Sequence, residues 1–371
     1  MKTIAIFSGY SLPHLGGVEK YTDSITKEFV KLGYRVIIAS SDYTFSNNYV
    51  KEEKDIVTIK LPVHKMFVDR YPIIKKNKDY KDIIKKLDDY NIDVIIVNTR
   101  FYLTSHVGAN YGKNNGIPVY LIEHGSNYVT LDNKFIDFFA NRYEDFLTWK
   151  IKKKIKGFYG VSNACGRWLK HFKIDAVGTW YNSIDTNQKL PIRKEHNRIN
   201  FLYAGRLIKQ KGVLNILDAF TNLEKKYKDI SLYIAGDGPE LEGYKNKFTS
   251  ENIHFLGKLK YDELVNYYAI TDVFLYPPLW PEGLPTSIVE AGLMKCSIIG
   301  TDQGGITEVI SNNQNGLIVG TTMEALQDGM DTLISSKELR NKFSSNIYNT
   351  ILDKFSWNVT AKKILKDIEN I

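Results

Sequence analysis

Short apolar runs alternate along this chain with longer segments in which apolar residues recur every three or four positions. The first run covers residues 3–7, and a helical pattern with Tyr21, Ile25, Phe29 and Leu32 follows it and stops at Gly33. Mostly apolar runs of this length are typical of buried parallel strands, and the longer period is typical of helices packed on them. Further strands are predicted at residues 36–39, 92–97, 119–122 and 158–161.

A polar stretch at residues 182–197 interrupts this alternation, which then resumes. A helix is predicted at residues 213–227, and strands at 201–204, 232–235, 253–256, 273–276, 297–300 and 317–319. Repeated strand–helix units in both halves predict an α/β protein with two parallel-sheet domains. We place the domains at residues 1–185 and 186–356, and we expect a last amphipathic helix at residues 357–371.

Composition narrows the setting of the protein. The 371 residues suffice for two domains, and no apolar run approaches the length of a membrane span. Cys165 and Cys296 lack metal-ligand spacing, so we expect no disulfide and a reducing, cytosolic compartment. Residues 1–185 hold 28 Lys+Arg against 20 Asp+Glu, whereas residues 186–371 hold 22 of each. The excess of positive charge in the first half predicts an anionic partner for that half.

Two glutamates follow the predicted strand at residues 273–276. Glu282 lies on a Gly/Pro loop, and Glu290 lies about one turn into the helix predicted after it. In open α/β sheets ligands bind at the carboxyl ends of the strands, and helix-start amides favour phosphate there. Carboxylates beside a phosphate site indicate a ligand that also carries hydroxyls, such as a sugar nucleotide. The alternative for Glu290 is a capping box with Ser287, and the alternative for Glu282 is a solvated loop.

Other strand ends add cations and glycines. Arg206 and Lys211 lie between a predicted strand and helix, where they can clamp a diphosphate and need no metal to neutralise a leaving group, although such loops are also often simply solvated. Gly16 and Gly17 open the first helix and permit close backbone contact with a phosphate or sugar. His124 ends the strand at residues 119–122. The loops carry no metal-ligand motif, so we expect no catalytic metal.

Together these segments resemble the retaining, GT-B-fold nucleotide-sugar glycosyltransferases of family 4. The resemblance covers nearly the whole chain and is strongest at residues 200–319. Its motifs are Gly-Gly-Val-Glu at 16–19, Glu-His-Gly at 123–125, Val-Ser-Asn at 161–163, Asn-Ser-Ile-Asp at 182–185, Gly-Arg-x4-Lys-Gly at 205–212, Gly-Asp-Gly-Pro at 236–239 and Glu-x7-Glu at 282–290. Ser183 and the segment 292–296 depart from the usual family pattern.

The resemblance implies a fold of two Rossmann-like domains facing across a cleft, with the last helix packed back on the first domain. It also implies roles for the candidate residues. Arg206 and Lys211 would hold the donor diphosphate, Glu290 the ribose, and Glu282 with the Gly283 and Leu284 amides the transferred sugar. His124 would contact that sugar from the other domain, and Gly17, beside Gly16, would approach the phosphates. The backbone at Gly257, Lys258 and Leu259 would contact the base, and Pro285 belongs to the loop that binds the donor.

The implied activity is metal-independent transfer of a sugar from a nucleotide diphosphate, UDP by default, with retention at the anomeric carbon. The acceptor would be a saccharide or a lipid-linked sugar of bacterial surface polysaccharide or glycolipid assembly. Two alternatives remain: a nucleotide-sugar 2-epimerase of the same fold, and a non-catalytic partner subunit of a glycosyltransferase. The four residues Arg206, Lys211, Glu282 and Glu290 favour catalysis over the partner subunit.

The basic first half predicts peripheral contact with an anionic membrane at its inner, cytoplasmic face. Residues 60–86 combine nine Lys+Arg and three acids with Met66, Phe67, Tyr71, Ile73 and Ile74, and residues 149–156 form a second basic stretch. Mixed basic and apolar side chains are typical of interfacial segments. Nucleic acid is the other polyanion to consider, but the chain shows no recognisable nucleic-acid module.

Overall fold

The structure is a computed structural model in which residues 1–14, 16–46, 48–64, 71–128 and 134–369 are described. The chain forms two compact units. Unit 1 contains Met1–Asn182 and Trp357–Ile371, and unit 2 contains Ser183–Ser356. The division therefore lies slightly earlier than the boundary predicted after Asp185, and the terminal helix belongs to the first unit.

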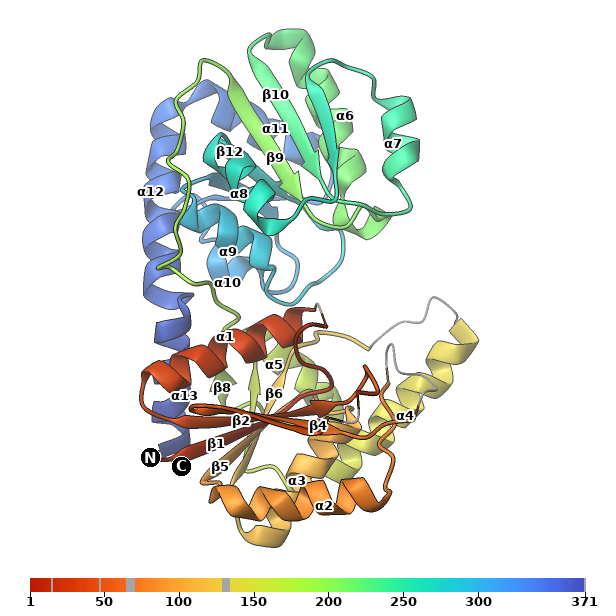
Figure 1. Ribbon diagram of the computed structural model, residues 1–371. Helices are drawn as coiled ribbons and strands as arrows, with labels where there is room; N and C mark the ends of the chain where they lie inside the picture. Colours follow the sequence, from red (N-terminus) through yellow and green to blue (C-terminus); the bar gives the residue numbers. More distant parts are fainter. Residues whose placement is uncertain (15, 47, 65–70, 129–133, 370–371) are drawn as a thin grey trace. The chain divides into compact units, whose positions relative to one another are not determined.

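Unit 1 is built on an eight-stranded sheet with the strand order β3-β4-β2-β1-β5-β6-β7-β8 (Figure 1). Neighbouring strands are parallel except for β3, which is antiparallel to β4. The strands are β1 (Thr3–Phe7), β2 (Arg35–Ser41), β3 (Val50–Glu53), β4 (Ile56–Leu61), β5 (Val94–Asn98), β6 (Val119–Glu123), β7 (Gly157–Gly160) and β8 (Gly178–Thr179). The sequence did not predict β3, β4 and β8, because β3 is largely exposed, β4 alternates between buried and half-buried residues, and β8 has only two residues.

Helices cover both faces of this sheet. They are α1 (Gly17–Lys31), α2 (Lys78–Lys86) with the 3₁₀ turn η1 (Leu87–Tyr90), α3 (Leu103–Asn115), α4 (Lys134–Lys152), α5 (Asn163–Leu169) and α13 (Trp357–Glu369). Successive residues of a strand point to opposite faces, so Ile4 and Ile6 of β1 join one apolar core while Ala5 and Phe7 join the other.

The terminal helix α13 packs on unit 1, as predicted, beside α1 (Figure 1). Trp357 contacts Tyr21 of α1 edge-on, with ring centroids 5.0 Å apart. The indole Nε1 of Trp180 donates to Asp367 Oδ2 at 2.8 Å. Buried apolar contacts of α13 therefore decide which unit it joins, since burial of such surface contributes roughly 25 cal/mol per Å².

Unit 2 has a six-stranded parallel sheet with the order β11-β10-β9-β12-β13-β14, which confirms the predicted second parallel-sheet domain. Its strands are β9 (Ile199–Ala204), β10 (Ile230–Ala235), β11 (Ile253–Gly257), β12 (Val273–Tyr276), β13 (Ser297–Thr301) and β14 (Leu317–Val319). Its α-helices are α6 (Val213–Lys226), α7 (Leu241–Lys247), α8 (Tyr261–Ala269), α9 (Thr286–Leu293), α10 (Ile306–Val309), α11 (Met323–Ser335) and α12 (Lys337–Lys354). All six predicted strands of this half are present.

Candidate active site

A half-buried ion pair lies at the carboxyl end of the unit 2 sheet. The Lys211 ammonium contacts the two carboxylate oxygens of Glu282 at 2.5 and 2.6 Å and the Tyr276 hydroxyl at 2.9 Å. Tyr276 in turn donates to Glu282 Oε2 at 2.8 Å. Burial, followed by the charge of Glu282, raises the pKa of Tyr276, so its hydroxyl remains a donor. The structure thus brings the two predicted residues Lys211 and Glu282 together and adds Tyr276. The sequence analysis missed Tyr276, although its position as the last residue of β12 could have marked it as a site residue.

Glycines fix the loops that carry this pair. Gly212 ends the 3₁₀ turn η3 (Lys209–Lys211) with φ of 70°, and a Cβ there would lie 2.1 Å from Pro277 O. Gly304 also has φ of 70°, and its Cβ would lie 1.9 Å from Glu282 O. The amide of Gly305 donates to Glu282 O at 3.0 Å. Only a glycine fits such close backbone approaches at positive φ, so these loops hold Lys211 and the Glu282 backbone in place.

A cavity of about 560 Å³ opens at neighbouring strand ends of unit 2. Arg206, Lys258 and Leu259 line it together with Ser287 at the start of α9. The Gly236–Gly238 turn forms another part of the wall, and a Cβ on Gly236 would lie 1.8 Å from Gly205 O. The glycine at 236 is therefore explained by contact with the neighbouring loop. The cavity has the size of a small-molecule site and contains three of the residues or segments assigned to the donor.

The two cations predicted to bind the diphosphate, Arg206 and Lys211, have different surroundings in the structure. The Arg206 side chain is exposed at the cavity, whereas Lys211 is not one of its lining residues and pairs with Glu282. A short chain of contacts connects them. The hydroxyl of Tyr203 donates to Arg206 O at 3.0 Å, and the Tyr203 ring stacks on Tyr276 with centroids 6.3 Å apart. The two cations are therefore parts of one packed region of unit 2.

Glu290 occupies the middle of α9, and the capping-box alternative is wrong. Helix α9 begins at Thr286 after the N-cap Pro285, and no side-chain hydrogen bond caps it. The Glu290 carboxylate instead accepts from the hydroxyl of Tyr268 at 3.2 Å. Leu284 and Pro285 are buried and anchor the loop before the helix, while Gly283 is half-buried and its carbonyl accepts from Gly305. Gly257 closes β11 with φ of 67°, directly before Lys258.

The other candidates belong to unit 1. Gly16 is the N-cap of α1 and Gly17 its first residue; a Cβ on Gly17 would meet no atom within 4 Å. His124 follows β6 and is half-buried, with its ring edge-on to Tyr21 at 5.1 Å. The amide nitrogen of Asn98 donates to Thr22 Oγ1, so the Asn98 oxygen, 2.9 Å from His124 Nε2, accepts the ring proton. The lone pair of the neutral ring is then on Nδ1.

A buried charge cluster supports the His124 turn. Arg100 binds Glu123 at 2.9 Å and Glu144 at 2.7 Å, and all three side chains are fully buried. The second oxygen of Glu123 accepts from the amides of His124 and Gly125, both at 3.1 Å. The Arg100 guanidinium also stacks 4.3 Å from the Phe172 ring centroid. The position of Glu123 beside His124 was visible in the sequence, but the other two members of the cluster, Arg100 after β5 and Glu144 of α4, were not.

We expect His124 to remain neutral at physiological pH. Desolvation lowers its pKa from 6.5 to about 3. As pH falls below 6.5, the imidazole of His124 takes up a proton in the unfolded chain but stays neutral in the folded protein. Protonation therefore favours the unfolded state, and the free energy of unfolding, unaffected by this group above pH 6.5, decreases as pH falls toward 3. The loss approaches about 1.4 kcal/mol per pH unit. Denaturant unfolding of wild type and His124→Gln at pH 8 and pH 5 should show the smaller pH dependence in the variant; equal dependence would contradict the neutral assignment.

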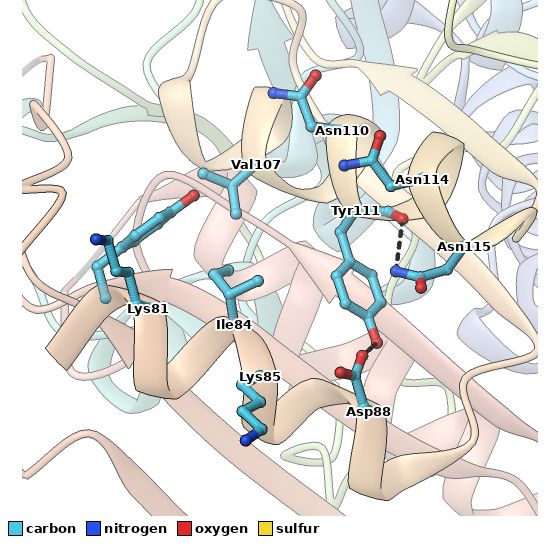
Figure 2. Close-up of a pocket in the computed structure, with 10 residues that line it drawn as sticks. Lys81, Ile84, Lys85, Asp88, Val107, Asn110, Tyr111, Asn114 and Asn115 are labelled. Atoms are coloured by element: carbon cyan, nitrogen blue, oxygen red, sulfur yellow. Dashed lines mark hydrogen bonds between the residues drawn. The ribbon is translucent and has the colours of Figure 1, made fainter. Parts of the chain in front are cut away.

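A second cavity, of about 380 Å³, lies between α2 and α3 of unit 1 (Figure 2). Lys81, Ile84 and Lys85 of α2 and Val107 and Tyr111 of α3 are among its lining residues, and the Lys85 ammonium points away from α3 in this view. The Tyr111 hydroxyl donates to Asp88 at 2.7 Å within the wall. None of the residues predicted for the active site lines this cavity, and its walls are helices rather than strand ends. The cavity of unit 2 is therefore the candidate site, because predicted residues line it.

The basic stretch of unit 1 is less apolar at its surface than predicted. Ile74 is buried and pairs with Val63, and the Tyr71 hydroxyl donates to Glu144 at 3.0 Å. Ile73 remains exposed, whereas Met66 and Phe67 lie outside the described residues. Ile74 is therefore unavailable to a lipid surface. None of the helices in the described ranges is long and apolar enough to span a membrane.

Comparison with known proteins assigns both units to a class. Residues 15–188 match Glycosyltransferase Family 4, and residues 185–350 match Glycosyl transferases group 1. Each match covers most of one unit. The protein is accordingly a GT-B glycosyltransferase of group 1 with a first domain of the family 4 type.

Similar proteins extend over almost the whole chain. An uncharacterized glycosyltransferase of Methanocaldococcus jannaschii is 26% identical over 99% of this chain and 98% of its own length. The phosphatidylinositol N-acetylglucosaminyltransferase GPI3 subunit of Saccharomyces cerevisiae is 20% identical over 99% of this chain and 83% of its own. The solved structure of HepE from Anabaena in complex with UDP covers both chains completely, with a TM-score of 0.74 and 18% identity, and shows the shared fold.

Proposed function

We propose that the protein transfers a sugar from a nucleotide diphosphate donor to a saccharide or lipid-linked acceptor, with retention at the anomeric carbon. The observation that carries this proposal is the Lys211–Glu282–Tyr276 cluster in the same packed region of unit 2 as the cavity lined by Arg206 and Lys258. Cations and a carboxylate at adjacent strand ends suit a ligand that combines phosphate with sugar hydroxyls. The Anabaena fold neighbour bound to UDP supports UDP as the nucleotide.

In this proposal each residue has a defined task. Arg206 and Lys211 bind the diphosphate, and Glu282 exchanges its bond to Lys211 for hydroxyls of the transferred sugar. Glu290 binds the ribose, and the backbone at residues 257–259 contacts the base. The amides of Gly283 and Leu284 and the ring of His124 hold the sugar, and Gly17 lies against the phosphates.

The proposed reaction occurs on one face of the sugar. The bond between the anomeric carbon and the donor phosphate oxygen breaks as the acceptor oxygen bonds to the same face of that carbon. The departing phosphate oxygen takes the acceptor proton. Arg206 and Lys211 stabilise the charge that develops on the leaving group, the type of electrostatic contribution that often dominates catalysis.

The donor assignment is tested by nucleotide binding to Arg206→Ala. Loss of one charge-assisted contact costs about 1.5–3 kcal/mol, so the dissociation constant for UDP should rise by roughly 10- to 150-fold. Lys209→Ala, an exposed cation in the same loop, is the matched control and should bind UDP like wild type. Equal UDP affinity in both variants and wild type would exclude the proposed cavity as the diphosphate site.

The proposed chemistry proceeds without a divalent metal because two protein cations supply the neutralising charge. Transfer from a panel of UDP-sugars, followed by mass spectrometry and by NMR of the product anomer, should continue in EDTA. Activity lost in EDTA and restored by Mn²⁺ would overturn this part of the proposal. An altered sugar in place of a new glycosidic bond would identify an epimerase, and donor binding without turnover across acceptors would indicate a non-catalytic subunit.

We also propose that the acceptor is reached from the cytoplasmic face of a membrane with anionic lipid. The support is the basic surface of unit 1, where Lys75, Lys76, Lys78 and Lys81 are exposed before and along α2. The name of the yeast relative, which belongs to a phosphatidylinositol N-acetylglucosaminyltransferase, identifies a lipid-modifying enzyme with the same family resemblance.

A further inference from the structure

Helix α4 presents a continuous aromatic face to solvent. Five of its large side chains are 43–58% exposed: Phe138, Phe139, Tyr143, Phe146 and Trp149. From Phe139 they recur at spacings of four, three and three residues, and Phe138 lies eight residues before Phe146, which places all five along one side of an α-helix. Large exposed apolar side chains on a soluble surface usually occur singly, so their concentration on one helix indicates a contact surface.

The opposite side of α4 is already used for folding. Glu144, Leu147, Thr148 and Ile151 are buried, and Glu144 accepts from Arg100 at 2.7 Å. The helix is therefore fixed to unit 1 through this side, and its first turns extend beyond the sheet (Figure 1). Because the buried side anchors the helix, the aromatic face does not turn inward.

The same exposed face carries cations. The Arg142 guanidinium lies 5.7 Å from the Phe138 ring centroid, and the Lys150 ammonium lies 4.4 Å from that of Phe146. By helical spacing, Phe138, Arg142, Phe146 and Lys150 form one row, each four residues after the last. The nearest acids, Asp137 and Asp145, project from the border of the face or beyond it, and Asp145 is engaged by Tyr128 and Arg142.

A basic hollow adjoins the aromatic face. A cavity of about 310 Å³ is lined by Trp149 of the face together with Lys152, His171 and Lys173. One acid, Asp145, also contributes to its wall. Cationic side chains next to aromatic ones suit a surface that combines anionic groups with an apolar layer beneath them.

We infer that the exposed face of α4 inserts into the interface of a membrane that contains anionic lipid. An amphipathic helix with aromatic residues and cations on its outer side lies in the headgroup region with the rings toward the acyl chains. A second copy of the chain fits less well, because a twofold contact would place the same cationic face against itself. This inference rests on the proposed membrane-side location of the acceptor. It assigns membrane insertion to the aromatic side chains of α4 instead of the apolar residues near α2.

The test compares vesicle binding of wild type with the triple variant Phe138→Ser, Phe146→Ser, Trp149→Ser. Partition onto vesicles of phosphatidylcholine and phosphatidylglycerol should fall at least about tenfold, because the variant removes the apolar area that inserts. The control Val177→Ser, Ile192→Ser removes two other exposed apolar side chains and should bind like wild type. A second variant replaces Lys75, Lys76, Lys78 and Lys81 with Gln. It should lose only the part of vesicle binding that 0.5 M salt also removes from wild type, since salt screens surface charge.

Each outcome is decisive. Unchanged partition of the triple variant overturns the inference, as does an equal loss in the control. A wild-type dimer that becomes a monomer in the triple variant, with vesicle binding intact, would assign the face to self-association. UDP affinity, measured in the same preparations, separates this inference from the proposed function: the triple variant should bind UDP normally, whereas failure of wild type to bind any nucleotide would overturn the donor site alone. Circular dichroism and unfolding of the triple variant establish that it is folded.

Discussion

Lys211→Met should reduce kcat/KM for sugar transfer by at least about 100-fold, more than any other single change in the proposed donor site. In the structure Lys211 forms an ion pair with Glu282 and contacts the Tyr276 hydroxyl. The variant removes a cation that the leaving diphosphate needs in the transition state, where such groups contribute about 2.7–4 kcal/mol. It also leaves the half-buried Glu282 carboxylate without its cation, and this unpaired negative charge repels an anionic donor.

A double-mutant cycle separates these two contributions. Glu282→Gln alone should lower transfer because it changes the group proposed to bind sugar hydroxyls, while UDP binding should persist or strengthen as Lys211 is released. The double variant should lose less than the product of the single losses, since residues in contact are coupled. Lys209→Met is the matched control in the same turn and should retain wild-type kinetics. If the losses in kcat/KM from the two single substitutions simply multiply in the double variant, the Lys211–Glu282 ion pair has no role in turnover.

Arg100→Met should lower the free energy of unfolding by about 3–5 kcal/mol, because it leaves two buried carboxylates without their cation. Both ion pairs of Arg100 are fully buried, and Glu123 also accepts from the two amides of the His124 turn. Urea unfolding at pH 7.5 measures the loss. Arg142→Met on α4 removes an exposed cation, 3.4 Å from Asp145, and should change stability by less than about 1 kcal/mol.

Neutralising the whole buried cluster distinguishes a charge effect from a packing effect. A triple variant, Arg100→Met with Glu123→Gln and Glu144→Gln, leaves no unpaired charge and keeps acceptors for the His124 and Gly125 amides. It should therefore be more stable than Arg100→Met alone, because breaking one partner costs more than removing the complete set. A triple variant as unstable as the sum of the single changes would show that these charges do not act as a unit.

The parallel core of each domain could be predicted from the chain alone. Strands such as β1, β12 and β14 have the predicted bounds because short apolar runs have few other ways to be buried. The edge strand β3 and its neighbour β4 escaped prediction because β3 is largely exposed and every second residue of β4 is only half-buried. The capping box considered at Ser287 was wrong because a Ser-x-x-Glu spacing does not specify where the helix begins, and the N-cap of α9 is Pro285.

By itself, the sequence determined the class of the protein and most of the side chains at its strand ends. Order along the chain fixes which residues follow each strand, and parallel strands bring those residues to one edge of a sheet. Only the tertiary structure decided how they pair. Lys211 binds Glu282, Arg100 joins carboxylates from β6 and α4, and α13 joins the first unit. It also decided which side of α4 is exposed. These outcomes depend on burial and on contacts between residues far apart in the chain, which local spacing does not encode.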